Sequence, residues 1–314
     1  MLNFLPYWLR GTLALLLVIT NTFFWFPFLL LGTLLKIVIP VHFARKIMTL
    51  LLINIANIWV SGNSLILALT ERTNWVVTGT EDLVKDDWYF VNCNHQTWSD
   101  IPIVQKIMNR KTPMLKFFLK KELIWVPIMG ICWWALDFPF MKRFSAEYIK
   151  KHPEMRGKDL ETTRKACEKF KTTPVAVLNF LEGTRFTPAK HDKQQSPYTN
   201  LLKPKYGGAA FVLSSMGEQM HTMLDITVFY PDGTPGFWDL LCGKVKVVVV
   251  DVRKVSIPST LRGKDYSQDN VFKAEFKGWI NTVWQDKDKL IEQFKATYQE
   301  RPNQTQGTAP VLEQ

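Results

Sequence analysis

Two long apolar stretches dominate residues 1–70. Residues 13–31 carry no charged side chain, and the apolar character continues to Pro40 with Lys36 as the single charge. A helix of this length spans about 30 Å of hydrocarbon, whereas the apolar part of a cleaved signal peptide is shorter. We therefore expect residues 1–70 to form a membrane anchor.

The second apolar stretch, residues 47–69, contains several Asn, Ser and Gly residues. Because of these polar side chains, its pattern fits both a helix that crosses the bilayer and one that enters a single leaflet. We expect a helical hairpin of one of these two kinds. Pro27 should kink or end the first helix, since proline lacks the N–H that a helix interior requires.

The pattern changes after Asn74 to short apolar runs that alternate with helical stretches. Five runs are rich in Val, Ile, Phe and Tyr and bounded by Gly, Pro or Asp, which is typical of strands: residues 75–79, 87–94, 174–183, 224–231 and 244–257. Helices are expected to begin near Ser99 and after Lys205, and to cover residues 157–172 and 272–294. This alternation predicts an α/β fold, in which a mostly buried mixed sheet is flanked by helices.

The charge balance narrows the class of partner. The chain carries a net charge of +11 and has a pI of about 9.4, which favours anionic partners. No recognition helix, zinc module or RNA-binding signature is visible, so we expect acidic lipid headgroups and not nucleic acid. The four cysteines are far apart and form no CxxC pair, as expected of reduced thiols in a reducing compartment.

Polar residues with catalytic potential follow two of the predicted strands. In NHQTWSD (94–100), Asp100 is placed in the first turn of the next helix, from which it can reach the imidazole of His95. A carboxylate on one ring nitrogen leaves the other free to accept a proton, as in a general base. The same spacing also fits a histidine at a strand end beside a helix-capping acid. Cys93 offers a further alternative, a thiol nucleophile that forms an acyl-enzyme.

The second cluster follows the strand at residues 174–183. In FLEGTR (180–185), Gly183 permits a close backbone approach, and Arg185 offers a planar group suited to phosphate. Because ligands bind beyond the carboxyl ends of strands in open α/β sheets, we expect the two clusters to face each other.

The two motifs resemble the first and third signature blocks of the glycerophospholipid acyltransferases, a family that includes the bacterial 1-acyl-sn-glycerol-3-phosphate acyltransferases. Residues 117–143 resemble the second block. Residues 201–210 and 225–231 resemble the last block in the subgroup that includes the lysocardiolipin-type enzymes. The resemblance covers residues 75–260 and implies an O-acyltransferase.

The resemblance also implies a mechanism. His95, oriented by Asp100, would deprotonate the sn-2 hydroxyl of lysophosphatidic acid. The alkoxide would attack an acyl thioester of CoA or acyl carrier protein (ACP) and give phosphatidic acid. Backbone amides at the start of the helix after His95 would stabilise the oxyanion. The acceptor phosphate would be held by Lys121, Arg143, Glu182, Gly183, Thr184 and Arg185.

The expected organisation is a membrane anchor at residues 1–70, an acyltransferase domain at 71–300 and a disordered tail at 301–314. The resemblance implies no metal and no tightly bound cofactor. Acyl-CoA or acyl-ACP would be a co-substrate, and the partners would be membrane lipids. The expected location is the bacterial inner membrane, with the catalytic domain on its cytoplasmic face, and the oligomeric state is not indicated. Two alternatives stay open: remodelling of another lysophospholipid such as lysophosphatidylglycerol, and a non-catalytic lipid-binding scaffold.

Overall fold

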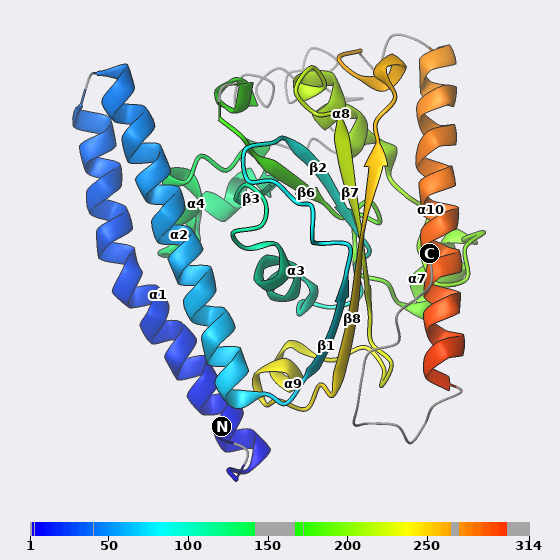
Figure 1. Ribbon diagram of the computed structural model, residues 1–314, viewed down its shortest axis with the longest axis horizontal. Coiled ribbons are helices and arrows are strands. Elements are labelled where there is room, and N and C mark those ends of the chain that lie inside the picture. The colour runs from blue at the N-terminus through cyan, green and yellow to red at the C-terminus, as the bar shows by residue number, and fades with distance from the viewer. Residues whose placement is uncertain are drawn as a thin grey trace.

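The computed structural model describes residues 2, 4–39, 41–141, 167–171, 173–264 and 270–299. The chain begins with two long helices, α1 (Tyr7–Val38) and α2 (His42–Thr70), which form an antiparallel hairpin at one side of the molecule (Figure 1). Both helices are long and apolar enough to cross a membrane, by length and composition. The predicted helical hairpin is therefore present.

Pro27 neither ends nor interrupts α1, which continues to Val38. The expectation that Pro27 could end the helix was wrong, because it considered only the local cost of proline. Pro27 is exposed on the outer side of α1, whereas Leu29 packs into a buried cluster with Leu52 of α2. This packing directly after the proline helps to offset the hydrogen bond that it removes.

A six-stranded mixed sheet forms the centre of the remaining chain, in the order β1-β8-β7-β2-β6-β3. All neighbouring pairs are parallel except β7 and β8. Because β8 is reversed, β8 and β1 begin at the edge of the sheet where β2, β6 and β7 end. The bounds are β1 (Asn74–Thr78), β2 (Tyr89–Cys93), β3 (Leu115–Phe117), β6 (Ala176–Asn179), β7 (Thr222–Phe229) and β8 (Val247–Ser256).

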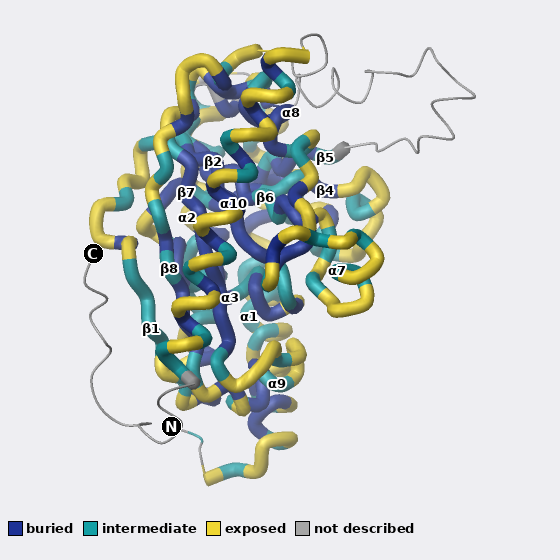
Figure 2. Tube along the Cα trace, turned by 90° about the vertical axis from the view of Figure 1, so that its right-hand side faces the viewer, coloured by how far each residue is buried: buried dark blue, intermediate teal, exposed yellow. Residues whose placement is uncertain are grey.

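Two apolar cores cover the two faces of this sheet. Phe90 of β2 belongs to the core under α8 (Tyr206–Met216) and α10 (Asn270–Gln299). Its neighbour Val91 belongs to the core under the hairpin, α3 (Asp100–Met108) and α9 (Phe237–Leu241). Figure 1 shows α10 and the hairpin on opposite sides of the sheet, and Figure 2 shows β2 and β7 in the dark blue of buried residues. The predicted mixed sheet flanked by helices is confirmed.

The five predicted strands correspond to β1, β2, β6, β7 and β8, whereas β3 was not predicted. The expected tail at residues 301–314 and most of the helix expected at 157–172 lie outside the described residues. The smaller elements are β4 (Leu119–Lys120), β5 (Phe140–Met141), α4 (Met129–Ala135), α7 (Pro188–Gln194) and the 3₁₀ helices η1 (Lys121–Trp125), η3 (Glu168–Lys171) and η4 (Ser259–Leu261).

The hairpin contacts the rest of the chain along much of its length. Near its base, Gly11 lies so close to α9 that a Cβ there would be 3.0 Å from the Trp238 ring. Further along, Leu29 shares an apolar cluster with Ala135 of α4. Gly11 and Leu29 are 18 positions apart in the sequence, so these contacts extend over about 27 Å of helix.

A buried ion cluster connects α10 to three strands of the sheet. Asp225 of β7 lies 2.9 Å from Lys287 Nζ and 2.6 Å from Arg253 Nη2, and it accepts the Asn92 side-chain N–H at 2.7 Å. Lys287 also donates to Ile226 O at 2.6 Å. The side chains of Lys287 and Asp225 are both fully buried. A buried charge of this kind is tolerated only when it is paired and hydrogen-bonded.

We expect Lys287→Met to lower the free energy of unfolding by about 3 kcal/mol, because Asp225 would lose its fully buried cationic partner and keep only the partly exposed Arg253. The matched control is Lys289→Met, since Lys289 is exposed on the same helix, and it should change stability by less than about 0.5 kcal/mol. Denaturant unfolding in detergent micelles, followed by tryptophan fluorescence, measures both effects. Equal stabilities of the two variants would contradict the role of the cluster.

Candidate active site

Strand β2 delivers His95 to the edge of the sheet. The strand is buried throughout, and Asn94 extends its contact with β7 by one residue. The Asn94 side chain donates to Val228 O at 2.9 Å and accepts from Val228 N at 2.8 Å. The Asn94 side chain thus makes the two hydrogen bonds that a backbone residue of a paired strand would make, and it fixes the chain directly before His95.

Asp100, the first residue of α3, holds the imidazole in place. Its Oδ2 lies 2.9 Å from His95 Nδ1 and accepts the backbone N–H groups of Gln96 at 2.6 Å and Thr97 at 2.9 Å. Its Oδ1 accepts the Tyr230 hydroxyl at 2.6 Å. The carboxylate is fully buried, and its charge is compensated by these donors and by the helix N-terminus. His95 Nε2 makes no hydrogen bond to any described residue, so it is available for proton transfer.

The backbone amides that were expected to stabilise an oxyanion already donate hydrogen bonds to side chains of the same turn. The N–H groups of Gln96 and Thr97 both bind Asp100, and the N–H of Ser99 donates to Thr97 Oγ1 at 3.3 Å. That expectation was wrong for these amides, because the buried carboxylate needs the same donors. The turn before α3 therefore serves to seat Asp100.

Tyr230 was not among the predicted site residues. Burial and the nearby Asp100 charge raise the pKa of its hydroxyl well above the usual range, so the hydroxyl stays protonated and donates. Tyr230 directly follows β7, the strand that pairs with β2, and this pairing was not visible from the sequence. The only signal was a tyrosine at the polar end of a predicted strand.

The second motif holds the backbone of His95 from both sides. The His95 N–H donates to Glu182 Oε1 at 2.7 Å, and its carbonyl accepts from Phe186 N at 2.7 Å. The other Glu182 oxygen accepts Leu202 N–H at 3.1 Å. Burial raises the pKa of Glu182 to about 7, although the two N–H donors and the charge of Lys287 act against this rise. Glu182 thus joins three chain segments and does not face an open pocket.

Lysine side chains surround the loop at Gly183 and Thr184. Gly183 has a φ of 65°, and a Cβ there would lie 2.7 Å from the side chain of Lys205. Lys190, from α7, donates to Thr184 Oγ1 and to Arg185 O, both at 2.9 Å. Neither lysine was predicted as a site residue, because the folding of α7 and α8 against this loop brings them there.

Arg185 lies at the mouth of the site. Its guanidinium carbon is 4.7 Å from the centre of the Trp98 ring, in the turn between His95 and α3. On the other side, the His95 ring stacks on Phe180 with centres 4.1 Å apart. The structure therefore brings the two motifs together, with the His95 imidazole and the exposed Arg185 guanidinium on the same edge of the sheet.

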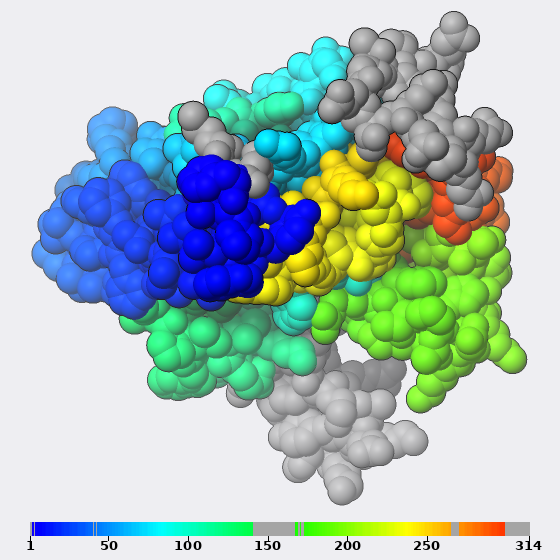
Figure 3. Space-filling model, turned by 90° about the horizontal axis from the view of Figure 1, so that it is seen from below, coloured from blue at the N-terminus to red at the C-terminus, as the bar shows by residue number. Residues whose placement is uncertain are grey.

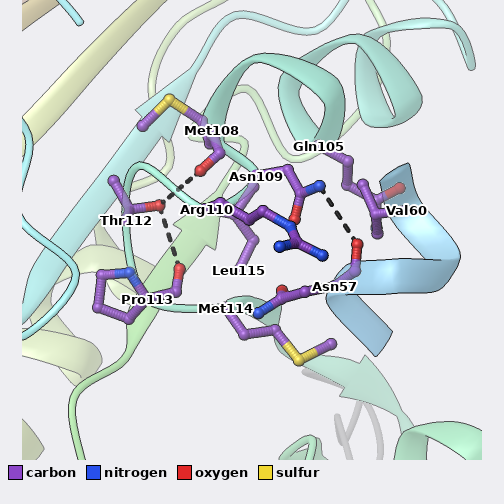
Figure 4. Close-up of a pocket in the computed structure, with 10 residues that line it drawn as sticks. All are labelled: Asn57, Val60, Gln105, Met108, Asn109, Arg110, Thr112, Pro113, Met114 and Leu115. Carbon is purple, nitrogen blue, oxygen red and sulfur yellow. Dashed lines mark hydrogen bonds between the residues drawn. The ribbon is translucent and has the colours of Figure 1, made fainter. Parts of the chain in front are cut away.

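A large apolar cavity begins beside Trp98 and runs along α3 between the hairpin and α4. Its volume is about 380 Å³, and its lining includes Trp25, Trp59, Ile101 and Trp133. A small pocket of mixed polar and apolar lining follows at the far end of α3, where Asn109 donates to Asn57 O at 3.3 Å (Figure 4). The two share Val60, Gln105 and Met114, so the cavity adjoins a region with the polar side chains of Asn57 and Asn109 at its end farthest from His95.

Three further sequence predictions concern Cys93, Lys121 and Arg143. The Cys93 side chain is fully buried, and burial raises the pKa of its thiol well above the usual range, which disfavours the reactive thiolate. Lys121 is exposed at the start of η1, and no hydrogen bond or ion pair joins it to His95 or Arg185 in the described part of the chain. Arg143 lies outside the described residues.

Residues 74–231, which contain both motifs, match the family model described as Acyltransferase. The chain belongs to the acyltransferase family. The family match ends after Tyr230, so α9, β8 and α10 of this acyltransferase lie beyond it.

Among curated proteins, the chain is 26% identical over 189 residues to 1-acyl-sn-glycerol-3-phosphate acyltransferase gamma of Mus musculus, covering 57% of this chain and 46% of that protein. It is 26% identical over 191 residues to the delta form of Homo sapiens, covering 58% and 46%. The chain thus spans about half the length of the curated relatives that it matches.

Among solved structures, the chain resembles the 1-acyl-sn-glycerophosphate acyltransferase PlsC from Thermotoga maritima. The TM-score is 0.51 at 19% sequence identity, and the match covers 91% of this chain and 98% of that one. The two proteins share a fold.

We expect Glu182→Gln to remove a pH dependence of stability. Folding raises the pKa of Glu182 from 4.5 to about 7, so the folded protein holds this proton more tightly than the unfolded one. The contribution to stability is complete below about pH 4.5 and is lost as the pH rises through 7. Relative to Glu182→Gln, the wild type should therefore lose on the order of 3 kcal/mol over this range.

Denaturant unfolding of both proteins at several pH values from 4.5 to 8 measures this difference. Glu292→Gln is the control, because hydrogen bonds from Asn200 and Lys295 lower the pKa of the exposed Glu292 carboxylate. The difference in unfolding free energy between Glu292→Gln and the wild type should therefore vary little from pH 4.5 to 8. Parallel pH profiles for wild type and Glu182→Gln would contradict the prediction.

Proposed function

We propose that this protein is an O-acyltransferase that moves a fatty acyl group from a thioester to the sn-2 hydroxyl of lysophosphatidic acid and forms phosphatidic acid. The observation that carries this proposal is the pair of His95 and Asp100, at 2.9 Å, beside the exposed cation of Arg185. Family membership supports the reaction type, and the names of the matched relatives support the acceptor.

The proposed reaction begins at His95 Nε2. This nitrogen takes the proton of the acceptor hydroxyl, and the oxygen attacks the thioester carbonyl carbon. The tetrahedral intermediate then breaks its C–S bond, and the imidazolium returns the proton to the departing thiolate. Asp100 remains ionised throughout and stabilises the imidazolium, as four donors already hold its charge. Glu182 acts through the backbone of His95 as a positioning residue.

The acceptor phosphate is assigned to the loop of Gly183, Thr184 and Arg185. The exposed guanidinium of Arg185 suits two-point binding of phosphate. Lys190 and Lys205 add positive charge to the same loop. Phosphate held there would place a lysolipid hydroxyl near His95, which stacks on Phe180 of the same motif.

The fatty acyl chain is assigned to the apolar cavity along α3. Its volume of about 380 Å³ lies within the range of about 300–1,000 Å³ that is typical of small-molecule sites. The cavity begins at Trp98, the residue that also contacts Arg185. An acyl chain bound there would extend from the reacting carbonyl toward Gln105 and Asn109 at the end farthest from His95.

The hairpin is proposed to enter one leaflet of the membrane and not to cross it. The rest of the chain contacts it over about 27 Å, close to the full thickness of about 30 Å of hydrocarbon. A crossing hairpin would therefore draw polar parts of the domain into the lipid. The cytoplasmic face of a bacterial inner membrane fits the basic net charge, the four free cysteines and a donor of the CoA or ACP type.

We expect His95→Ala to lower kcat by about 10²- to 10⁴-fold, because the general base is lost. Cys93→Ala is the control and should keep most of the activity. The assay follows transfer from a radiolabelled acyl-CoA or acyl-ACP to lysophosphatidic acid in mixed micelles. A fully active His95→Ala variant would contradict the proposal, and an inactive Cys93→Ala variant with acylated wild-type protein would favour a thiol route. Faster transfer to lysophosphatidylglycerol would identify another acceptor, and lipid binding without any transfer would identify a scaffold.

We expect Arg185→Gln to raise the KM for lysophosphatidic acid by about 10- to 100-fold, since a charge-assisted bond to the phosphate is lost. Transfer to monoacylglycerol, which has no phosphate, should change little. Lys193→Gln is the matched control, because it removes an exposed cation from the neighbouring helix α7. Equal losses with both acceptors would show that Arg185 does not bind the phosphate.

A further inference from the structure

A second basic pocket lies at the base of the hairpin, outside the catalytic opening. Its volume is about 230 Å³, and three segments that are distant in sequence contribute to it. The lining residues are Tyr7, Arg10, Arg72, Gly243, Val245 and Lys246. Three of these six are cations and none is an acid. All six lie outside residues 74–231, which match the family model.

Arg10 forms the inner wall of this pocket. Its side chain is 95% buried, as its exposed fraction is 5%. The guanidinium lies 4.5 Å from the centre of the Tyr7 ring, and Nη1 donates to Thr70 O at 3.3 Å. Gly243 has a φ of 67°, and a Cβ there would collide with Thr70 O and lie 3.3 Å from Arg10 Nη1. The glycine therefore allows the backbone to close around a buried arginine.

The other two cations are exposed at the rim, and their chain segments are joined by backbone contacts. Arg72 precedes β1 and Lys246 precedes β8, the two strands that pair in parallel. Thr73 Oγ1 donates to Val245 O at 2.7 Å, and Asn74 N donates to Lys246 O at 2.7 Å. These bonds fix the distance between the backbones of Arg72 and Lys246, so the fold itself holds the two sides of the pocket in position.

Carboxylates near the pocket are already paired. Glu71 accepts from Lys106 at 2.8 Å and from the Trp75 ring nitrogen at 3.1 Å. Asp239 lies 3.3 Å from Lys244. The two exposed cations of the rim, Arg72 and Lys246, form no ion pair with another described residue, and this favours an anion with several oxygen atoms.

Exposed aromatic residues near this pocket indicate the depth at which it would lie in a membrane. Phe4, before α1, and Trp8, in its first turn, are exposed, as are Phe237 and Trp238 of α9. Figure 3 shows the blue start of α1 against the yellow segment that includes α9. Tryptophan and tyrosine favour the layer of lipid headgroups, where the phosphates of phospholipids also lie.

We propose that the pocket of Arg10, Arg72 and Lys246 binds the headgroup phosphate of an anionic phospholipid of the surrounding membrane. An anionic lipid is favoured over a zwitterionic one, because the lining offers no carboxylate to a choline or ethanolamine ammonium group. This lipid is distinct from the acceptor, and the proposal does not depend on acyl transfer.

The pocket is connected to the catalytic opening through the segment that contains α9. At one end of this segment, Pro235 O accepts the Thr97 hydroxyl at 2.7 Å, next to the turn that seats Asp100. At the other end, residues 243–246 line the pocket. Both lie beyond the same edge of the sheet, so a bound headgroup would hold the catalytic edge against the membrane surface.

The test compares lipid binding by the full chain in detergent micelles, measured by native mass spectrometry. The probes are phosphatidylglycerol and phosphatidylcholine with identical acyl chains. All proteins carry Arg185→Gln, which weakens binding of anions at the catalytic loop. The variant Arg72→Gln/Lys246→Gln changes two exposed cations, so that the buried Arg10 and the fold are left intact.

We expect the parent protein to prefer phosphatidylglycerol, and the double variant to bind it about 10- to 30-fold more weakly. The matched control is Lys277→Gln/Lys289→Gln, which removes the same charge from exposed positions on α10 and should bind like the parent. Equal weakening in both double variants would overturn the proposal, because net charge alone would explain it. Equal binding of both lipids by the parent would also overturn it. A third result would overturn it as well: unchanged lipid binding by Arg72→Gln/Lys246→Gln, together with a raised KM for acyl-CoA when the same two changes are made in a protein with the native Arg185. In that case the pocket would bind the phosphate of a soluble molecule.

Discussion

The arrangement of the site depends on the burial of one charge, the carboxylate of Asp100 at the start of α3. A buried carboxylate without partners costs several kcal/mol, so the fold must supply donors to it. The donors come from His95, from the turn at residues 96–97 and from Tyr230 after β7. The hydrogen bonds that satisfy this charge therefore also orient the imidazole of His95, the base of the reaction that we propose.

A second constraint joins the two motifs to each other. The backbone of His95 is held by Glu182 and Phe186, which lie on either side of the cationic loop. The loop that carries Arg185 is thus positioned by the same hydrogen bonds that position the base. Further support comes from α10, because Trp284 donates to Leu202 O at 2.9 Å and Leu202 N–H in turn donates to Glu182.

Local sequence patterns predicted the elements and the meeting of the two motifs, but not the strand order and helix docking that complete the site. The five longest strands, the hairpin and the proximity of His95 to Asp100 follow from apolar periodicity and short spacing, which act within a few residues. Tyr230, Lys190 and Lys205 were missed because strand order and helix docking bring them to the site. Pro27 and the turn amides were misjudged for a related reason: packing against α2 maintains the helix, and Asp100 takes the N–H groups of Gln96 and Thr97.

The hairpin is more than an attachment, since Trp25 and Trp59 form one wall of the apolar cavity along α3. A soluble version made by deleting residues 1–70 would open that cavity to water on one side. The same deletion would uncover the apolar core in which Ile66 and Leu67 pack with Val91, close to His95 in the sequence. The hairpin is therefore a structural part of the folded domain, and the acyl site that we propose exists only while the hairpin is in place.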